Sequence, residues 1–323
     1  MADREEKTGR NDTGKKSKGG KRNKIVAIEM IILILLIMAA AVIFIQKDKS
    51  VKEAAKIHDQ KTKKTEQTTT ATQKDNEIEE ETEDMDEETG DRDEAVPDRS
   101  NFAVQPGVSV GTTEQSDEKI VYLTLDDGPS DNTQAVLDIL DKYNAKATFF
   151  VTGEMPEYKD MIKAAYDKGH TIGMHTYSHD YAKVYASVDA YFQDLDQIGQ
   201  MVQEEIGYVP CFIRFPGGSS NTVSKKYTAG IMSTLVQEVQ NRGYQYYDWN
   251  GSSGDGSVRT TEELVAQATS FDSNNIILLC HDSHGKQTTV EALPQIIEHY
   301  QSLGYTFKAL DRDSFVAHHG VNN

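Results

Sequence analysis

The sequence predicts an α/β fold in which about seven parallel strands form a distorted (β/α) barrel. From residue 120 onward, short runs rich in β-branched and aromatic residues alternate with amphipathic stretches of helical period. Strands that alternate with helices pair in parallel, because each helix carries the chain back across the sheet. An open doubly wound sheet is the alternative arrangement.

The expected elements follow one another regularly. Strands are predicted at 120–125, 147–151, 171–174, 211–215, 244–248, 276–280 and 305–310. Helices are predicted at 132–143, 157–168, 187–206, 224–242, 260–270 and 288–303. Thr260 with Glu263, and Thr288 with Glu291, fit capping boxes at two helix starts. Glycines stand where four helices should end, at Gly169, Gly207, Gly243 and Gly304.

The first 117 residues differ from the rest in composition. Residues 1–24 are basic, and 25–45 form a nearly unbroken apolar run. A bilayer span needs about 20 such residues. We therefore expect a single-pass, uncleaved transmembrane anchor with a cytoplasmic basic tail, and an extracytoplasmic location for the folded domain that follows. A cleaved signal peptide is the alternative.

The composition after the apolar run predicts the remaining boundaries. Residues 46–117 are charged and poor in aromatic side chains, which predicts a disordered linker. The catalytic domain is expected at 118–315, followed by a tail at 316–323 whose His318 and His319 should be exposed to solvent. The formal net charge of the chain is −18, so nucleic acid is excluded as a partner.

Five short motifs lie at or just past the ends of predicted strands. That edge of a parallel α/β fold is where catalytic and binding groups gather. The motifs are Thr124–Pro129, His175–His179, Arg214–Gly217, Asp248–Trp249 and Leu279–His281.

Two histidines and one aspartate in these motifs predict a metal site. His175 and His179 are four residues apart, so both imidazoles can face one ion. Asp126 or Asp127 would be the third ligand, which leaves an open position for water or substrate. Neighbouring strand residues point in different directions, so the other aspartate stays free as a base. Beside a metal and an arginine, that carboxylate should keep a low pKa.

The five motifs in this order resemble the polysaccharide deacetylase family, also called the NodB-homology family or carbohydrate esterase family four. The resemblance covers about residues 118–315 and is strongest to membrane-anchored peptidoglycan N-acetylglucosamine deacetylases of Gram-positive bacteria. It implies metal-dependent hydrolysis of N-acetyl groups from cell-wall glycan, with release of acetate, by a monomeric catalytic domain. Alternatives are a deacetylase of chitin oligosaccharide or O-acetylated xylan, or a non-catalytic wall-glycan binding module.

The resemblance also implies a catalytic role for four residues. Asp126 would be the general base, and Arg214 would orient it. His281 would be the general acid, with Asp248 as its charge partner.

The remaining motif residues would bind the metal and the substrate. Asp127, His175 and His179 would hold one divalent ion, with Zn²⁺ favoured and Co²⁺, Mn²⁺ or Ni²⁺ as alternatives. Several family members have an aromatic residue where this chain has Gly217. The residues implied to contact substrate are Pro216, Gly217, Trp249 and Leu279.

Cys211 and Cys280 are the only cysteines, and both lie in predicted apolar strands. Buried free thiols are expected on that ground. A disulfide stays open as the alternative, because the predicted domain is extracytoplasmic.

Overall fold

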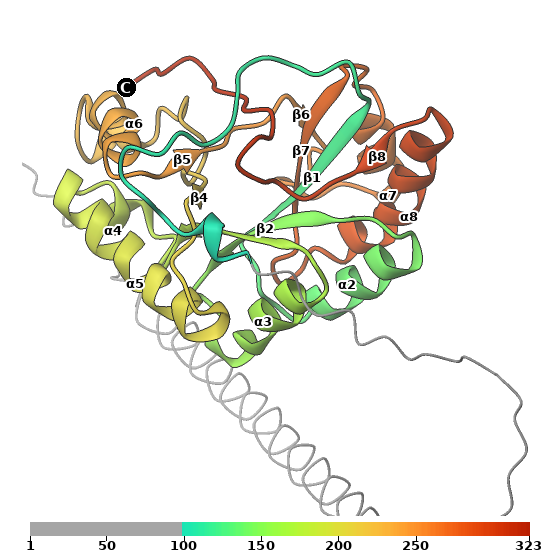
Figure 1. The fold of residues 1–323 in the computed structure, drawn as a ribbon, viewed down its shortest axis with the longest axis horizontal. Coiled ribbons are helices and arrows are strands. Elements are labelled where there is room, and N and C mark those ends of the chain that lie inside the picture. The colour runs from blue at the N-terminus through green and yellow to red at the C-terminus, as the bar shows by residue number, and fades with distance from the viewer. Residues whose placement is uncertain (1–98) are drawn as a thin grey trace, which may run out of the picture. The chain divides into compact units, whose positions relative to one another are not determined.

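The computed structural model describes residues 99–323 (Figure 1). The predicted basic tail, the transmembrane anchor and the linker up to residue 98 lie outside the described residues. Among residues 99–323, none of the helices has both the length and the apolar composition that a bilayer crossing requires.

An eight-stranded parallel sheet forms the centre of this part of the chain. Its path runs β5-β4-β3-β2-β1-β7-β6, and β8 pairs with the start of β1. Because β5 and β6 are the two ends of the path, the sheet is an open, curled half-barrel and not a closed barrel. The strands are β1 (Ile120–Asp126), β2 (Ala147–Thr152), β3 (Thr171–Thr176), β4 (Phe212–Ile213), β5 (Gln245–Tyr246), β6 (Gly251–Ser252), β7 (Asn275–His281) and β8 (Thr306–Phe307).

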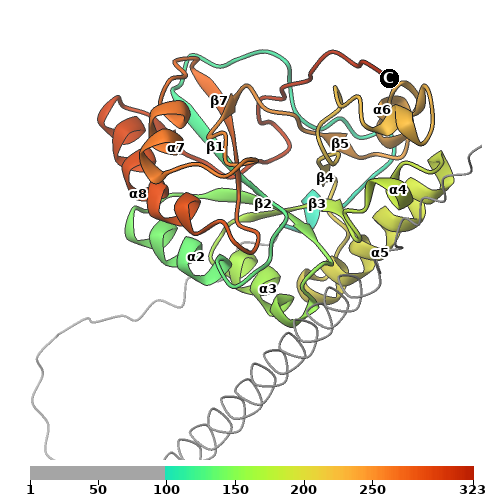
Figure 2. The same ribbon diagram turned by 180° about the vertical axis from the view of Figure 1, so that it is seen from behind.

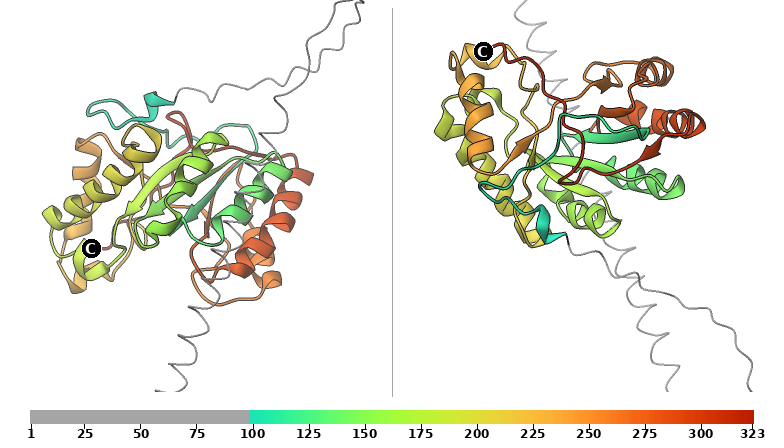
Figure 3. Two further views of the ribbon diagram at one scale, coloured as in Figure 1. Left: turned by 90° about the horizontal axis from the view of Figure 1, so that it is seen from below. Right: turned by 45° about the horizontal axis from the view of Figure 1, so that its top comes forward.

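Helices surround the outside of the curled sheet (Figures 2 and 3). The strand β1 is buried along its whole length, as expected for a parallel strand that is covered on both faces. The helices are α2 (Thr133–Lys142), α3 (Asp160–Asp167), α4 (Tyr181–Val184), α5 (Val188–Ile206), α6 (Ile231–Asn241), α7 (Thr261–Ala268) and α8 (Gln287–Ser302). Three short 3₁₀ turns are η1 (Ser100–Phe102), η2 (Pro156–Tyr158) and η3 (Ser224–Lys226).

Most predicted elements are present, with local differences. The capping box of Thr260 and Glu263 is confirmed at the start of α7. The second predicted box is wrong, because α8 starts at Gln287 and Thr288 therefore lies inside its first turn. The sequence did not predict the short elements α4 and β6. Both cysteines are buried and free, as expected.

Chain segments before β1 and after β8 belong to the folded domain. The ring of Phe102 meets that of Phe212 edge to face with centroids 5.3 Å apart. The N–H of Val104 donates to the carbonyl of Val209 at 2.8 Å. Packing of Phe102, Val104 and Val110 against the core attaches the segment before β1 to the domain. The expectation that the linker extends to residue 117 is therefore corrected.

Candidate active site

All five motifs contribute to one region at the carboxyl ends of the strands. The last residues of β1 and β7, Asp126 and His281, are direct neighbours in the sheet. A cavity of about 240 Å³ opens there. Its lining residues are Asp126, Asp127, His175, His179, Tyr181, Gly217, Trp249, Gly256, Leu279, His281 and Lys286.

The predicted metal-binding residues lie close together. Nε2 of His175 and Nε2 of His179 are each 3.4 Å from Oδ1 of Asp127. Two ligands about 2.1 Å from one tetrahedral ion would be about 3.4 Å apart. Within residues 99–323, this buried Oδ1 has no hydrogen-bond donor. The three side chains therefore fit a divalent cation in both spacing and chemistry.

The fold fixes the donor atom of each histidine. Nδ1 of His175 is 2.8 Å from the carbonyl of Arg214, so Nδ1 carries the proton and Nε2 faces Asp127. Burial lowers the pKa of His175 to about 3, which keeps the ring in the neutral form that binds metals. Asp127 and His179 both have positive φ, at 68° and 46°. Such strained conformations of non-glycine residues are typical of functional sites.

A carboxylate from α5 holds the loop that presents His179. Asp194 accepts hydrogen bonds from the N–H groups of Tyr177 and Ser178, at 2.6 and 3.1 Å. It also accepts from the hydroxyl of Ser178 at 2.5 Å. His179 thus lies on a tight loop stabilised by Asp194, a residue that the sequence analysis did not include in the site.

Asp126 forms a buried ion pair with Arg214. Nη1 of Arg214 is 2.8 Å from Oδ1 of Asp126. The guanidinium is fully buried and also donates to Thr124 Oγ1 and to the carbonyl of Tyr247, at 2.7 and 2.8 Å. Burial raises the pKa of Asp126 above its usual value and outweighs the opposing effect of Arg214. The expectation of a low pKa referred to this carboxylate beside a bound cation, whose charge would lower it, and stays a prediction.

His281 is paired with Asp255, which corrects the predicted pairing with Asp248. Nδ1 of His281 is 2.7 Å from Oδ1 of Asp255, and the His281 N–H donates to Oδ2 at 2.8 Å. Thr289 donates to the same carboxylate at 2.8 Å. Burial by itself lowers the pKa of His281, but the hydrogen bond and charge of Asp255 raise it to about 9. Asp255 follows β6, the sheet neighbour of β7, whereas Asp248 follows β5 at the other edge.

The implied substrate-binding residues separate into two groups. Gly217, Trp249 and Leu279 line the cavity. Pro216 does not line it, and its carbonyl accepts a hydrogen bond from Tyr185 at 2.8 Å. Gly217 has φ 76°, and a Cβ there would lie 2.6 Å from the hydroxyl of Tyr181. The positive φ favours glycine here, and a larger residue would also require the hydroxyl of Tyr181 to move.

Sequence reasoning missed several residues of the site. Asp194 had a detectable signal, since it is a charged residue on the apolar face formed by Tyr191, Leu195 and Ile198 in one predicted helix. Asp255 had only a weak signal, because it lies in a Gly- and Ser-rich stretch without strand character.

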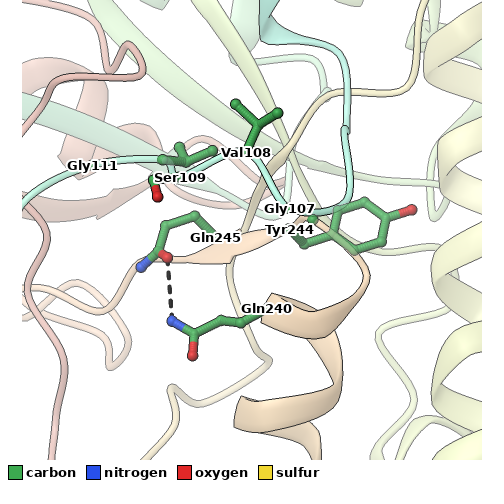
Figure 4. A pocket seen from close by; sticks show the side chains of 9 residues that line it. Gly107, Val108, Ser109, Gly111, Gln240, Tyr244 and Gln245 are labelled. Carbon is green, nitrogen blue, oxygen red and sulfur yellow. Dashed lines mark hydrogen bonds between the residues drawn. The ribbon is translucent and has the colours of Figure 1, made fainter.

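A second and larger cavity contains none of the predicted catalytic groups. It measures about 400 Å³ and is lined by residues 107–111, Gln240, Gly243, Tyr244 and Gln245. Figure 4 shows the amides of Gln240 and Gln245, which form a hydrogen bond of 3.3 Å. Its lining has no histidine or acidic side chain, so the smaller cavity is the candidate active site.

Comparison with known proteins identifies the family of the chain. The model of the family described as "Polysaccharide deacetylase" matches residues 113–236. A putative polysaccharide deacetylase of Bacillus subtilis is 30% identical over 217 residues, which are 64% of this chain and 72% of that protein. The chain belongs to the polysaccharide deacetylase family.

Further relatives of this polysaccharide deacetylase have more specific names. A peptidoglycan-N-acetylglucosamine deacetylase of Bacillus cereus is 29% identical over 226 residues, covering 65% of this chain and 78% of that protein. The solved catalytic domain of a peptidoglycan N-acetylglucosamine deacetylase from Eubacterium rectale has 45% identity and a TM-score of 0.63. It covers 67% of this chain and 98% of that chain. The polysaccharide deacetylase is thus an enzyme, a hydrolase of this family.

Proposed function

We propose that this polysaccharide deacetylase hydrolyses N-acetyl groups of cell-wall glycan, with peptidoglycan N-acetylglucosamine as substrate, and releases acetate. The observation that carries the proposal is the arrangement in one cavity: a candidate metal-binding triad, the Asp126–Arg214 ion pair and the His281–Asp255 pair. The names of the relatives from Bacillus cereus and Eubacterium rectale support the choice of substrate.

Asp127, His175 and His179 would hold one divalent cation. Zn²⁺ suits two imidazoles and a carboxylate, and Co²⁺, Mn²⁺ or Ni²⁺ could bind the same donors. When bound, such an ion polarises the acetamide carbonyl and lowers the pKa of its water from ~15.7 towards ~7.

Asp126 would take the proton of the attacking water. Its Oδ2 lies 3.9 Å from Nε2 of His175, beside the candidate metal site, while its Oδ1 is held by Arg214. One oxygen is therefore oriented and the other is free to act as the base. The N–H of Gly217 can stabilise the oxyanion, and such a donor contributes about 3 kcal/mol.

His281 would protonate the departing glucosamine nitrogen. Its Nδ1 is held by Asp255, and its Nε2 lies 4.0 Å from Oδ2 of Asp127. Because its pKa is raised to about 9, Nε2 carries a proton at neutral pH. The proton passes to the amine as the carbon–nitrogen bond breaks, and acetate and a free amine remain. We further propose that an anchor at residues 25–45 keeps the domain outside the cell membrane, near the wall.

Acetate release from defined polymers tests the proposal. The purified protein would be incubated with peptidoglycan strands, chitin oligosaccharide and acetylated xylan, with and without a chelator. We expect acetate from peptidoglycan, an unchanged glycan length by mass spectrometry, and loss of activity with chelator. Acetate release from xylan alone would contradict peptidoglycan as the substrate. Shortened glycan strands would contradict deacetylation as the reaction. No acetate from any polymer would favour a binding module.

A further inference from the structure

Residues 317–319 pair with the segment that carries Trp249. The N–H of Asp248 donates to the carbonyl of Ala317 at 3.0 Å, and the N–H of His319 donates to Oδ2 of Asp248 at 2.8 Å. The carboxylate of Asp248 is fully buried and also accepts from the N–H of Ser219 at 2.8 Å. Asp248 thus joins residues 317–319 to the loop after β4, and it makes none of its hydrogen bonds to His281.

His319 contacts Trp249 in two ways. Its Nε2 is 2.6 Å from the carbonyl of Trp249, so Nε2 carries the proton and donates. Its ring meets the indole edge to face, with centroids 4.8 Å apart and an interplanar angle of 79°. The indole also packs closely on Gly218, where an added Cβ would lie 3.2 Å or less from two ring atoms. The side chain of His319 therefore holds both the backbone and the indole ring of Trp249.

Trp249 in turn forms part of the wall of the active-site cavity, together with Leu279. We propose that His319 is a positioning residue that holds Trp249 so that the cavity accepts an acetyl group and excludes longer acyl groups. The inference rests on the proposed function for its chemistry. The expected exposure is corrected for His319, because only about a quarter of its side chain, 28%, is exposed, whereas His318 is exposed as expected.

Acyl selectivity gives the first test, with His319→Ala in the full-length chain. N-acetylated and N-propionylated glucosamine oligosaccharides would be compared by kcat/KM. The ratio of acetyl to propionyl activity should fall about tenfold, the effect of losing one hydrogen bond and one aromatic contact. His319→Gln should restore most of the ratio, because its amide can donate to the same carbonyl. An unchanged ratio in His319→Ala would overturn the proposal.

His318→Ala is a matched control in the same segment. The ring of His318 stacks on Tyr246 at 3.9 Å and does not contact Trp249. The His318→Ala variant should therefore leave the ratio of acetyl to propionyl activity unchanged. An equal loss of selectivity in both alanine variants would show that the segment matters only for folding, and would overturn the role of His319.

Fluorescence gives a second test that does not depend on turnover. Trp249 is the only tryptophan of the chain, so tryptophan emission reports on this side chain alone. Acrylamide should quench the emission of His319→Ala more strongly than that of the unchanged protein or of His318→Ala. Equal quenching in all three would refute the positioning of Trp249. Absence of acetate release by the unchanged protein would instead refute the proposed function, and the quenching comparison would still stand.

Discussion

Replacing Asp255 with asparagine should move the alkaline limit of the reaction, because this carboxylate keeps His281 protonated. Two interactions connect the residues: the Nδ1 contact of 2.7 Å and the backbone N–H contact of 2.8 Å. Asparagine has a similar shape but no charge. In Asp255→Asn the imidazole would lose the main interaction that opposes burial, and only the smaller effects of Asp126 and Asp127 would still raise its pKa.

The size of the effect follows from the pKa of His281. Asp255 is the main cause that raises it from the usual 6.5 to about 9, with smaller contributions from Asp126 and Asp127, so the value should fall towards 6.5 in the variant. A difference of 9 − 6.5 corresponds to about 3 kcal/mol. Little solvent screening applies, since 16% of the side chain is exposed. At pH 7.5, a pKa of about 6.5 would leave roughly one molecule in ten protonated, so kcat/KM should fall by up to about tenfold.

The pH profile of acetate release measures this change. In the unchanged enzyme, kcat/KM should decline as the pH rises through about 9, where His281 loses its proton. In Asp255→Asn the decline should move towards pH 6.5. Asp248→Asn is the control, and its alkaline limit should stay near 9 because Asp248 makes no hydrogen bond to His281. The assignment of Asp255 would be wrong if the alkaline limit of kcat/KM moved in Asp248→Asn and stayed near pH 9 in Asp255→Asn.

The same pair makes stability depend on pH. Because the pKa of His281 is higher in the folded state than in the unfolded state, its contribution is fully present below about pH 6.5. The contribution is lost as the pH rises through about 9. The free energy of unfolding, measured with denaturant at pH 6 and pH 10, should therefore differ less between the two pH values in Asp255→Asn than in the unchanged protein.

Three other variants test the remaining parts of the site. Asp126→Asn should abolish acetate release while metal stays bound by elemental analysis; normal turnover would remove Asp126 from the role of base. His175→Ala should lose the ion, and a stoichiometric ion in that variant would contradict the ligand assignment. Asp194→Ala should cost about 1–3 kcal/mol in urea unfolding, because buried N–H groups lose their acceptor. It should also weaken metal binding about tenfold or more, and unchanged affinity would contradict its role in orienting His179.

The sequence predicted the parts of the fold that depend on local pattern. The strand β1 and the helix α5 have long apolar patterns of clear period, and their observed ends agree with prediction to within one residue. The strand β6 has only two residues, Gly251 and Ser252, and neither has strand propensity. Its place in the sheet comes from pairing with β7, an interaction between distant segments that no local pattern contains.

The resemblance implied Asp248 as the partner of His281, and the unpredicted strand β6 explains why the sequence pattern did not point to Asp255 instead. Asp248 and Asp255 both follow strand ends, so their positions along the chain do not distinguish them. The order of strands does: β6 pairs with β7, which places Asp255 beside His281, whereas β5 lies at the opposite end of the path. Asp248 became available for a different role, which is to bind residues 317–319 beside Trp249. The order of strands thus decides which of the two aspartates raises the pKa of His281 and which one binds residues 317–319 beside Trp249.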